Sequence, residues 1–132
     1  MSVNNIGNKF IIGIDLGDAK NGLALGHLAT KTAVGLKTVA TELLKQELTR
    51  LIAEYDVECL VVGMPYNLAG NKTIRTQKTI ELVEELKKWF NIKIVTVDER
   101  WTTKQAKRSS TSDNDDRGAA ILIAQTYLDG LN

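Results

Sequence analysis

The sequence predicts an α/β fold in which helices cover both faces of a five-stranded mixed sheet. Five short apolar runs, rich in β-branched residues, have the length of strands, and two later runs are preceded by longer segments with apolar residues at helical spacing. Antiparallel strands at the start, followed by strands that alternate with helices, are typical of a mixed sheet. A chain of 132 residues is long enough for one core, so we expect a single domain over residues 1–132.

Each element is predicted from its own local signal. The pair Asn21-Gly22 favours a hairpin turn between the first two strands, and Thr41 is a candidate cap for the first helix. The run 59–63 is apolar throughout, which predicts a strand buried on both faces, and 92–97 is expected to be the next buried strand. A polar segment, residues 109–114, is expected to be a loop. Strands are expected at residues 9–15, 23–25, 33–39, 59–63 and 92–97, and helices at 41–55, 73–90 and 115–129, with a short helix from Trp101.

Composition limits the classes of function that the chain can have. A single cysteine, Cys59, excludes an internal disulfide, and together with a single histidine, His27, it excludes the usual structural zinc site. We expect structural roles for both residues. No segment is long and apolar enough for a membrane span, and the N-terminus lacks the layout of a signal peptide, so we expect a cytoplasmic protein. The net charge of +1 means that nucleic-acid binding would need a local basic patch.

Three carboxylates stand where the pattern predicts the ends of buried elements. Asp15 ends the apolar run 10–14, Glu99 follows the last predicted strand, and Asp116 opens the last helix. Each alone has an ordinary explanation: a turn residue, a surface partner of Arg100, and a first-turn acid favoured by the helix dipole. Brought together, the three would repel one another. A divalent metal held by oxygen ligands is the usual remedy for such repulsion.

Two basic clusters are expected close to these acids. One includes Arg75, at the start of the second long helix, and the other consists of Lys104, Lys107 and Arg108, after the Glu99 segment. Basic clusters are commonly solvated surface, but the sites of α/β sheets lie at the strand ends that these clusters flank. Phosphate binding is therefore the alternative interpretation.

Four motifs, in order along almost the whole chain, resemble those of the YqgF (RuvX) family. That family is described as Holliday junction resolvases and as nucleases that act on the precursor of 16S ribosomal RNA. The resemblance implies an RNase H-like fold. The matching segments are Gly13-Ile14-Asp15-Leu16-Gly17, Val61-Val62-Gly63-Met64-Pro65 with Asn67 and Gly70, Asp98-Glu99-Arg100-Trp101-Thr102-Thr103, and Asp116 followed by Ala119-Ala120-Ile121-Leu122 and Gln125-Thr126-Tyr127-Leu128.

The resemblance also implies a metal-dependent endonuclease. Asp15, Glu99 and Asp116 would be the catalytic, metal-binding acids of a site with two Mg²⁺ or Mn²⁺ ions about 3.5–4 Å apart, and Arg75 would face the phosphate backbone. Cleavage would leave a 5′-phosphate and a 3′-hydroxyl. The implied substrate is the 5′ end of pre-16S rRNA in ribosome biogenesis, with Holliday junction DNA in recombination as the alternative. The chain would be a monomer or a homodimer, and junction resolution requires the dimer.

The chain departs from the family pattern in two places. Residues 104–114 are shorter than the family's usual segment, and Asp18-Ala19 stands where Thr-Lys is more frequent, so positive charge is lost and substrate affinity stays open. A non-catalytic nucleic-acid-binding module is therefore a second interpretation. A phosphate-binding domain of actin-like kinases and ATPases is a third, although those proteins need two such domains. Asp115, beside Asp116, is a further candidate for the last acid.

Overall fold

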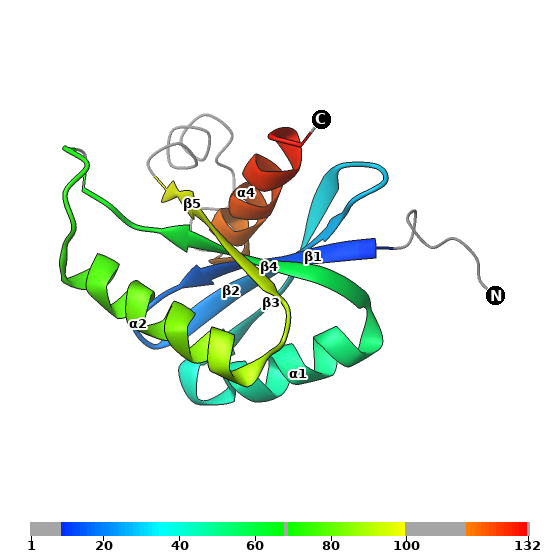
Figure 1. The fold of residues 1–132 in the computed structure, drawn as a ribbon, viewed down its shortest axis with the longest axis horizontal. Helices are drawn as coiled ribbons and strands as arrows, with labels where there is room; N and C mark the ends of the chain where they lie inside the picture. The colour runs from blue at the N-terminus through cyan, green and yellow to red at the C-terminus, as the bar shows by residue number, and fades with distance from the viewer. Residues whose placement is uncertain (1–8, 68, 100–115, 132) are drawn as a thin grey trace.

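The five predicted strands form one mixed sheet in the computed structural model, which describes residues 9–67, 69–99 and 116–131 (Figure 1). The strand order is β3-β2-β1-β4-β5. The first three strands pair antiparallel, whereas β4 runs parallel to both β1 and β5. The predicted mixed α/β sheet is therefore confirmed, but the predicted burial of the last strand is wrong, because β5 is an edge strand in which no residue is fully buried. The strands are β1 (Lys9–Leu16), β2 (Lys20–His27), β3 (Thr32–Ala40), β4 (Asp56–Met64) and β5 (Lys93–Asp98).

The predicted hairpin turn is wrong. Asn21 and Gly22 lie inside β2, where they pair with Leu16 and Asp15, and the chain reverses at residues 17–19 instead. The physical reason is that the Asn21 side chain is buried and forms hydrogen bonds with the backbone of Gly17 and of Val39. These tertiary hydrogen bonds outweigh the local preference of an Asn-Gly pair for a turn.

Three α-helices follow the predicted pattern with shifted starts. Thr41 is not the cap of the first helix, because it opens a 3-10 turn, η2 (Thr41–Leu43), and its hydroxyl contacts Asn21. Thr73 caps the second helix through a reciprocal capping box with Thr76. The expected short helix from Trp101 and the loop 109–114 lie outside the described residues. The helices are α1 (Leu44–Glu54), α2 (Ile74–Trp89) and α4 (Asp116–Asp129).

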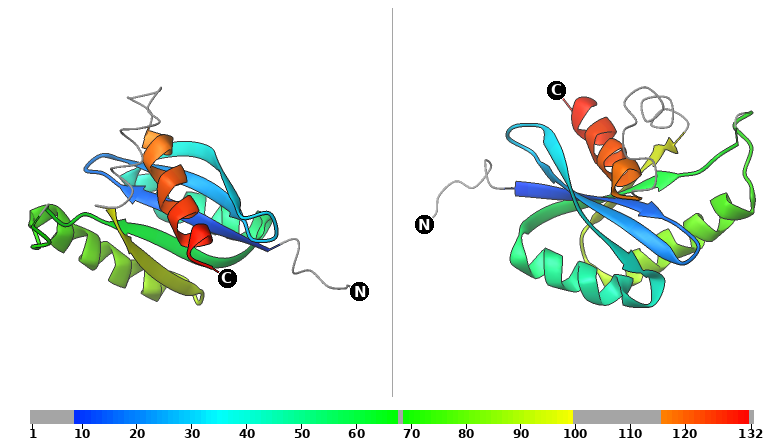
Figure 2. Two further views of the ribbon diagram at one scale, coloured as in Figure 1. Left: turned by 90° about the horizontal axis from the view of Figure 1, so that it is seen from above. Right: turned by 180° about the vertical axis from the view of Figure 1, so that it is seen from behind.

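The helices divide between the two faces of the sheet. Helices α1 and α2 lie on one face and α4 on the other (Figure 2). Each face has its own buried core, and the alternation of side chains along the strands assigns residues to one or the other. No helix in the described part of the chain has the length and apolarity that crossing a membrane requires.

Candidate active site at the carboxyl ends of the parallel strands

Strand alternation places Asp15 and Glu99 on the same face of the sheet. In β1, Ile11 belongs to the core under α4 and Ile14 to the opposite core, so Asp15 lies on the α4 side. In β5, Val97 belongs to the α4 core, and Glu99 follows two residues later on the same side. Because β1 and β5 run in the same direction, both acids stand at one edge of the sheet. This is the edge at which α/β sheets place their sites.

Gly63 of β4 makes room for the Glu99 side chain. A β-carbon at this position would lie 2.7 Å from Oε2 and 2.8 Å from Cγ of Glu99, and 2.5 Å from Cδ1 of Ile123 in α4. These distances are shorter than real contacts, so only glycine fits without displacing a neighbour. The Oε2 atom is shielded from solvent in this position. The glycine of the Val62-Gly63-Met64-Pro65 segment thus leaves the space that the Glu99 side chain occupies.

The pKa of Glu99 reflects its burial and its charged and hydrogen-bonding neighbours, among them Asp15. Burial raises the pKa of Glu99, and the neighbouring charge of Asp98 raises it further. The positive charge of Arg75 and a side-chain hydrogen bond with Asp15 act in the opposite direction. Two carboxyl groups within hydrogen-bond distance share a proton rather than ionise together. A divalent cation between them would favour the doubly ionised form, and their oxygens are the ligands that Mg²⁺ and Mn²⁺ prefer.

The backbone of α4 runs toward these two acids. A β-carbon at Gly13 would lie 2.7 Å from the Ala120 carbonyl oxygen, so the helix rests directly on the middle of β1. At the other end of the helix, Leu128 packs near Gly26, which pairs with Ile11 close to the start of β1. The amino end of α4 therefore points to the carboxyl edge of the sheet.

Asp116 is the first residue of α4, one helical turn before Ala120. The backbone thus carries the third predicted acid toward Asp15 and Glu99, while its side chain lies outside the described residues, as does Asp115. Within the described residues, no three acidic, histidine or cysteine side chains form a group that could hold a metal ion. The structure brings two of the three predicted ligands together.

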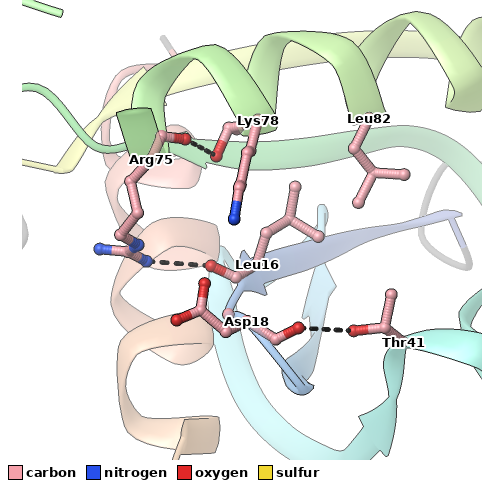
Figure 3. A pocket seen from close by; sticks show the side chains of 8 residues that line it. Leu16, Asp18, Thr41, Arg75, Lys78 and Leu82 are labelled. Atoms are coloured by element: carbon pink, nitrogen blue, oxygen red, sulfur yellow. Dashed lines mark hydrogen bonds between the residues drawn. The ribbon is translucent and has the colours of Figure 1, made fainter. Parts of the chain in front are cut away.

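Arg75 reaches the end of β1 from the first turn of α2. Its Nη2 atom donates a hydrogen bond to the carbonyl oxygen of Leu16, at 2.9 Å (Figure 3). The two side chains line a pocket of about 210 Å³ together with Asp18, Thr41 and Lys78, among others. Asp18 is exposed.

The other predicted basic residues, Lys104, Lys107 and Arg108, lie outside the described residues. Their position relative to the acids therefore stays a prediction. Arg75 is the one member of the predicted nucleic-acid-binding set that the described residues include, and it lies beside the strand that carries Asp15.

Asn21 is a functional candidate that the sequence did not reveal. Its side chain is fully buried, its Oδ1 accepts from the Gly17 N–H at 3.2 Å, and its Nδ2 donates to the Val39 carbonyl and the Thr41 hydroxyl, both at 3.3 Å. The residue thus ties the turn after Asp15 to the end of β3. Its only sequence signal was the Asn-Gly pair, which indicated a turn.

Cys59 and His27, for which we predicted structural roles, lie away from the acids. Cys59 is buried in β4, and burial raises the pKa of its thiol, which disfavours the nucleophilic thiolate. His27 contacts the Thr30 hydroxyl at 3.1 Å and lies against the ring of Phe10. Neither residue lies on the strand ends that carry the acids.

Comparison with protein families and sequences places the chain among known proteins. The profile of the RuvX family, described as Holliday junction resolvase, matches residues 9–130. A protein of Thermoanaerobacter pseudethanolicus named "Putative pre-16S rRNA nuclease" is 37% identical over 132 residues, which cover 90% of this chain and 95% of that protein. A protein of the same name from Rickettsia rickettsii is 34% identical, over 96% of this chain and 90% of that protein.

Solved structures show the same fold at low sequence identity. The RuvC structure of Thermus thermophilus superposes with a TM-score of 0.62 at 14% identity, over 89% of this chain and 92% of that one. The fowlpox virus Holliday junction resolvase superposes with a TM-score of 0.56 at 11% identity, over 92% of this chain and 99% of that one. The predicted RNase H-like fold is confirmed.

Proposed function

Because this chain belongs to the RuvX family, we propose that it is an endonuclease that hydrolyses phosphodiester bonds in nucleic acid, with Asp15, Glu99 and Asp116 as its catalytic acids. The placement of Asp15 and Glu99 on the same face and at the same carboxyl edge of the sheet carries this proposal, and the hydrogen bond between their side chains agrees with it. The orientation of α4, whose amino end points to the same edge, supports the third acid.

The acids fit a site for Mg²⁺ or Mn²⁺. Asp15 and Glu99 offer hard oxygen ligands in contact, and burial of Glu99 makes its ionised form depend on a nearby positive charge. Asp116 would complete the set. A bound divalent ion, or a pair of ions, supplies activated water and stabilises the charge of the leaving oxygen. The protein's own part is to hold the carboxylates on rigid strand ends and to shield them from bulk water.

The proposed substrate is the 5′ end of pre-16S rRNA, in ribosome biogenesis. The names of the relatives at 34–37% identity over most of the chain support this choice. The family description supports a second candidate, a Holliday junction. Junction resolution needs two cuts related by two-fold symmetry and therefore a homodimer, whereas a monomer suffices for one cut in RNA.

We further propose that Arg75, Lys104, Lys107 and Arg108 contact the phosphate backbone of the substrate. Arg75 is exposed at the edge that carries the acids, and its charge acts on Glu99. The net charge of the whole chain is only +1, so binding of nucleic acid has to depend on such a local group of cations.

A cleavage assay on three substrates tests this proposal. Single-stranded RNA with the pre-16S 5′ sequence, duplex DNA and four-way junction DNA are each incubated with Mg²⁺ or Mn²⁺. We expect metal-dependent cleavage, strongest on the RNA, and loss of cleavage in Asp15→Asn. Asp18→Asn is the matched control, because it removes an exposed carboxylate three residues away and should retain activity.

Three outcomes would contradict parts of the proposal. Cleavage that persists in Asp15→Asn would exclude this site as the source of the activity. Cleavage of the junction alone, by a dimer, would favour the resolvase. Tight binding of RNA without any cleavage would favour a non-catalytic binding module.

A further inference from the structure

We propose that Arg75 is a positioning residue, and that with Asn21 it clamps the Leu16–Gly17 peptide group, one residue beyond Asp15. The carbonyl oxygen of this peptide accepts from Arg75 Nη2 at 2.9 Å. Its N–H, on Gly17, donates to Asn21 Oδ1 at 3.2 Å. The inference rests on the proposed function for the role of Asp15, whereas the clamp itself rests on these two hydrogen bonds.

The end of β1 needs such support because the sheet holds it on one side only. Pairing of β1 with β4 ends at Ile14 opposite Val62, whereas pairing with β2 continues to Leu16 opposite Asn21. The last two residues of β1, Asp15 included, therefore extend beyond the ladder with β4. The guanidinium of Arg75 supplies a hydrogen bond to the Leu16 carbonyl at this point (Figure 3).

Arg75 is itself anchored to the end of β4. The buried Thr76, next to it in α2, donates a hydrogen bond from its hydroxyl to the carbonyl of Pro65, just after β4. The Thr79 hydroxyl donates to the Arg75 carbonyl at 2.9 Å, and Thr73 caps the same turn of the helix. The side chain of Arg75 thus links the end of β1 to the first turn of α2, which is itself hydrogen-bonded to the residue just after β4.

Asn21 supplies the other half of the clamp from β2. It is fully buried, and its amide nitrogen is bonded to the Val39 carbonyl and to the Thr41 hydroxyl, so its position is set by β3 and η2. The Leu16–Gly17 peptide group is therefore held from two different elements, α2 and β2. A hydrogen bond from a charged guanidinium is also stronger than one between neutral groups.

The clamp matters because a misplaced catalytic group is costly. A displacement of about 1 Å can lower the rate of an enzyme about 100-fold. The positioning role is additional to the phosphate contact proposed above for Arg75, and the two roles predict different losses. Loss of a phosphate contact weakens binding, whereas loss of the clamp lowers the rate of cleavage at saturating substrate.

Two charge-matched variants separate these roles. Arg75→Gln and Lys78→Gln each remove one positive charge from the same pocket, and only Arg75 donates to the Leu16 carbonyl. A glutamine side chain is too short to reach that oxygen from position 75. The measurements are kcat at saturating RNA, the Kd for RNA in Ca²⁺, and the amide hydrogen exchange of Gly17 by NMR.

We expect Arg75→Gln to lower kcat about 10- to 100-fold and to speed exchange of the Gly17 amide at least about tenfold, since its peptide loses one of two supports. Lys78→Gln should leave both values within about twofold of wild type. The rate loss should persist from pH 6 to pH 9, because a geometric defect does not titrate.

The proposal is overturned if Arg75→Gln leaves Gly17 exchange unchanged, if it leaves kcat unchanged, or if the two variants behave alike. A rate loss that disappears at high pH would also overturn it, because the effect would then belong to the charge of Glu99. A wild-type protein that cleaves nothing would contradict the proposed function instead, and Gly17 exchange in the two variants would still decide whether the clamp exists.

Discussion

The two faces of the sheet differ in how closely a helix backbone approaches the strands. The face under α1 and α2 packs large aliphatic residues against one another, among them Ile12, Leu48 and Leu60, all fully buried. The face under α4 has Gly13 and Gly63 in its strands and Ala120 and Ala124 in its helix. Large side chains keep a helix at a distance and fill the space between. Small ones let the helix backbone come close.

The two faces therefore contribute differently: one mainly stabilises the fold, and the other positions the candidate active site. On the face covered by α1 and α2, burial of apolar side chains stabilises the fold, as in other α/β proteins. On the α4 face, close approach brings the helix that begins at Asp116 onto the strand that carries Asp15, and leaves room for Glu99 beside Gly63. We therefore expect mutations on the two faces to have separable effects on folding and on activity.

The largest expected effect is the loss of cleavage when an acid on the α4 face is neutralised. Glu99→Gln and Asp116→Asn should each lower kcat more than about 100-fold, because even residues that only orient metal ligands cost 10–100-fold. Circular dichroism should show that both variants stay folded. If Asp115→Asn causes the loss and Asp116→Asn does not, Asp115 is the third acid.

A second prediction compares one substitution on each face. Leu48→Ala should lower the free energy of unfolding by about 2–5 kcal/mol, since it leaves a cavity under α1, with kcat within about threefold of wild type. Gly13→Ala should cost only about 1–3 kcal/mol, yet lower kcat at least about tenfold, because the added methyl would press on the Ala120 carbonyl and shift α4. Urea unfolding and single-turnover cleavage measure the pair.

Equal effects of these two variants on kcat would refute the division between the faces. Cleavage by Leu48→Ala is measured under conditions well below its unfolding midpoint, where the folded fraction of the variant is known, so that its rate can be compared with that of wild type.

A third prediction concerns the pH dependence of folding without metal. Burial raises the pKa of Glu99 above the 4.5 of an exposed glutamate, so the unfolded chain ionises first as pH rises. The stability of wild type should therefore fall as pH rises from about 4.5 toward the raised pKa of Glu99, and Glu99→Gln should not show this fall. Thermal unfolding between pH 4 and pH 8, with chelator present, measures the difference.

Added Mg²⁺ should offset the loss of stability of wild type at high pH, and it should not stabilise Glu99→Gln. Parallel pH profiles of the two proteins in chelator would show that Glu99 is not buried as described. The opposite slope would show that attraction by Arg75 exceeds the effect of burial.

The smallest expected effect concerns the salt dependence of RNA binding. If Lys104 and Lys107 contact phosphates, replacing either with glutamine should reduce the slope of log K against log[salt] by roughly one unit, without a change in sequence preference. Lys88→Gln, on the exposed last turn of α2, is the control and should keep the wild-type slope. RNA binding that does not depend on salt concentration would exclude phosphate contacts by these lysines.

The sequence by itself predicted the strands and the three long helices, and it singled out Asp15, Glu99 and Asp116 as the candidate acids. Periods of two and of about 3.6 residues are local properties, so strands 59–63 and 92–97 were recognisable from their composition alone. The position of Asp15 and Glu99 at the ends of apolar runs followed from the same local pattern. The motif resemblance then added the RNase H-like fold.

Only the tertiary structure decided the contacts between distant residues. The Asn21-Gly22 pair indicated a turn, but hydrogen bonds to Gly17 and Val39 place it inside β2. The bond from Arg75 to Leu16 joins residues 59 positions apart, and no local pattern encodes it. Such contacts depend on how packed elements meet, and that geometry exists only once the helices have docked on the sheet.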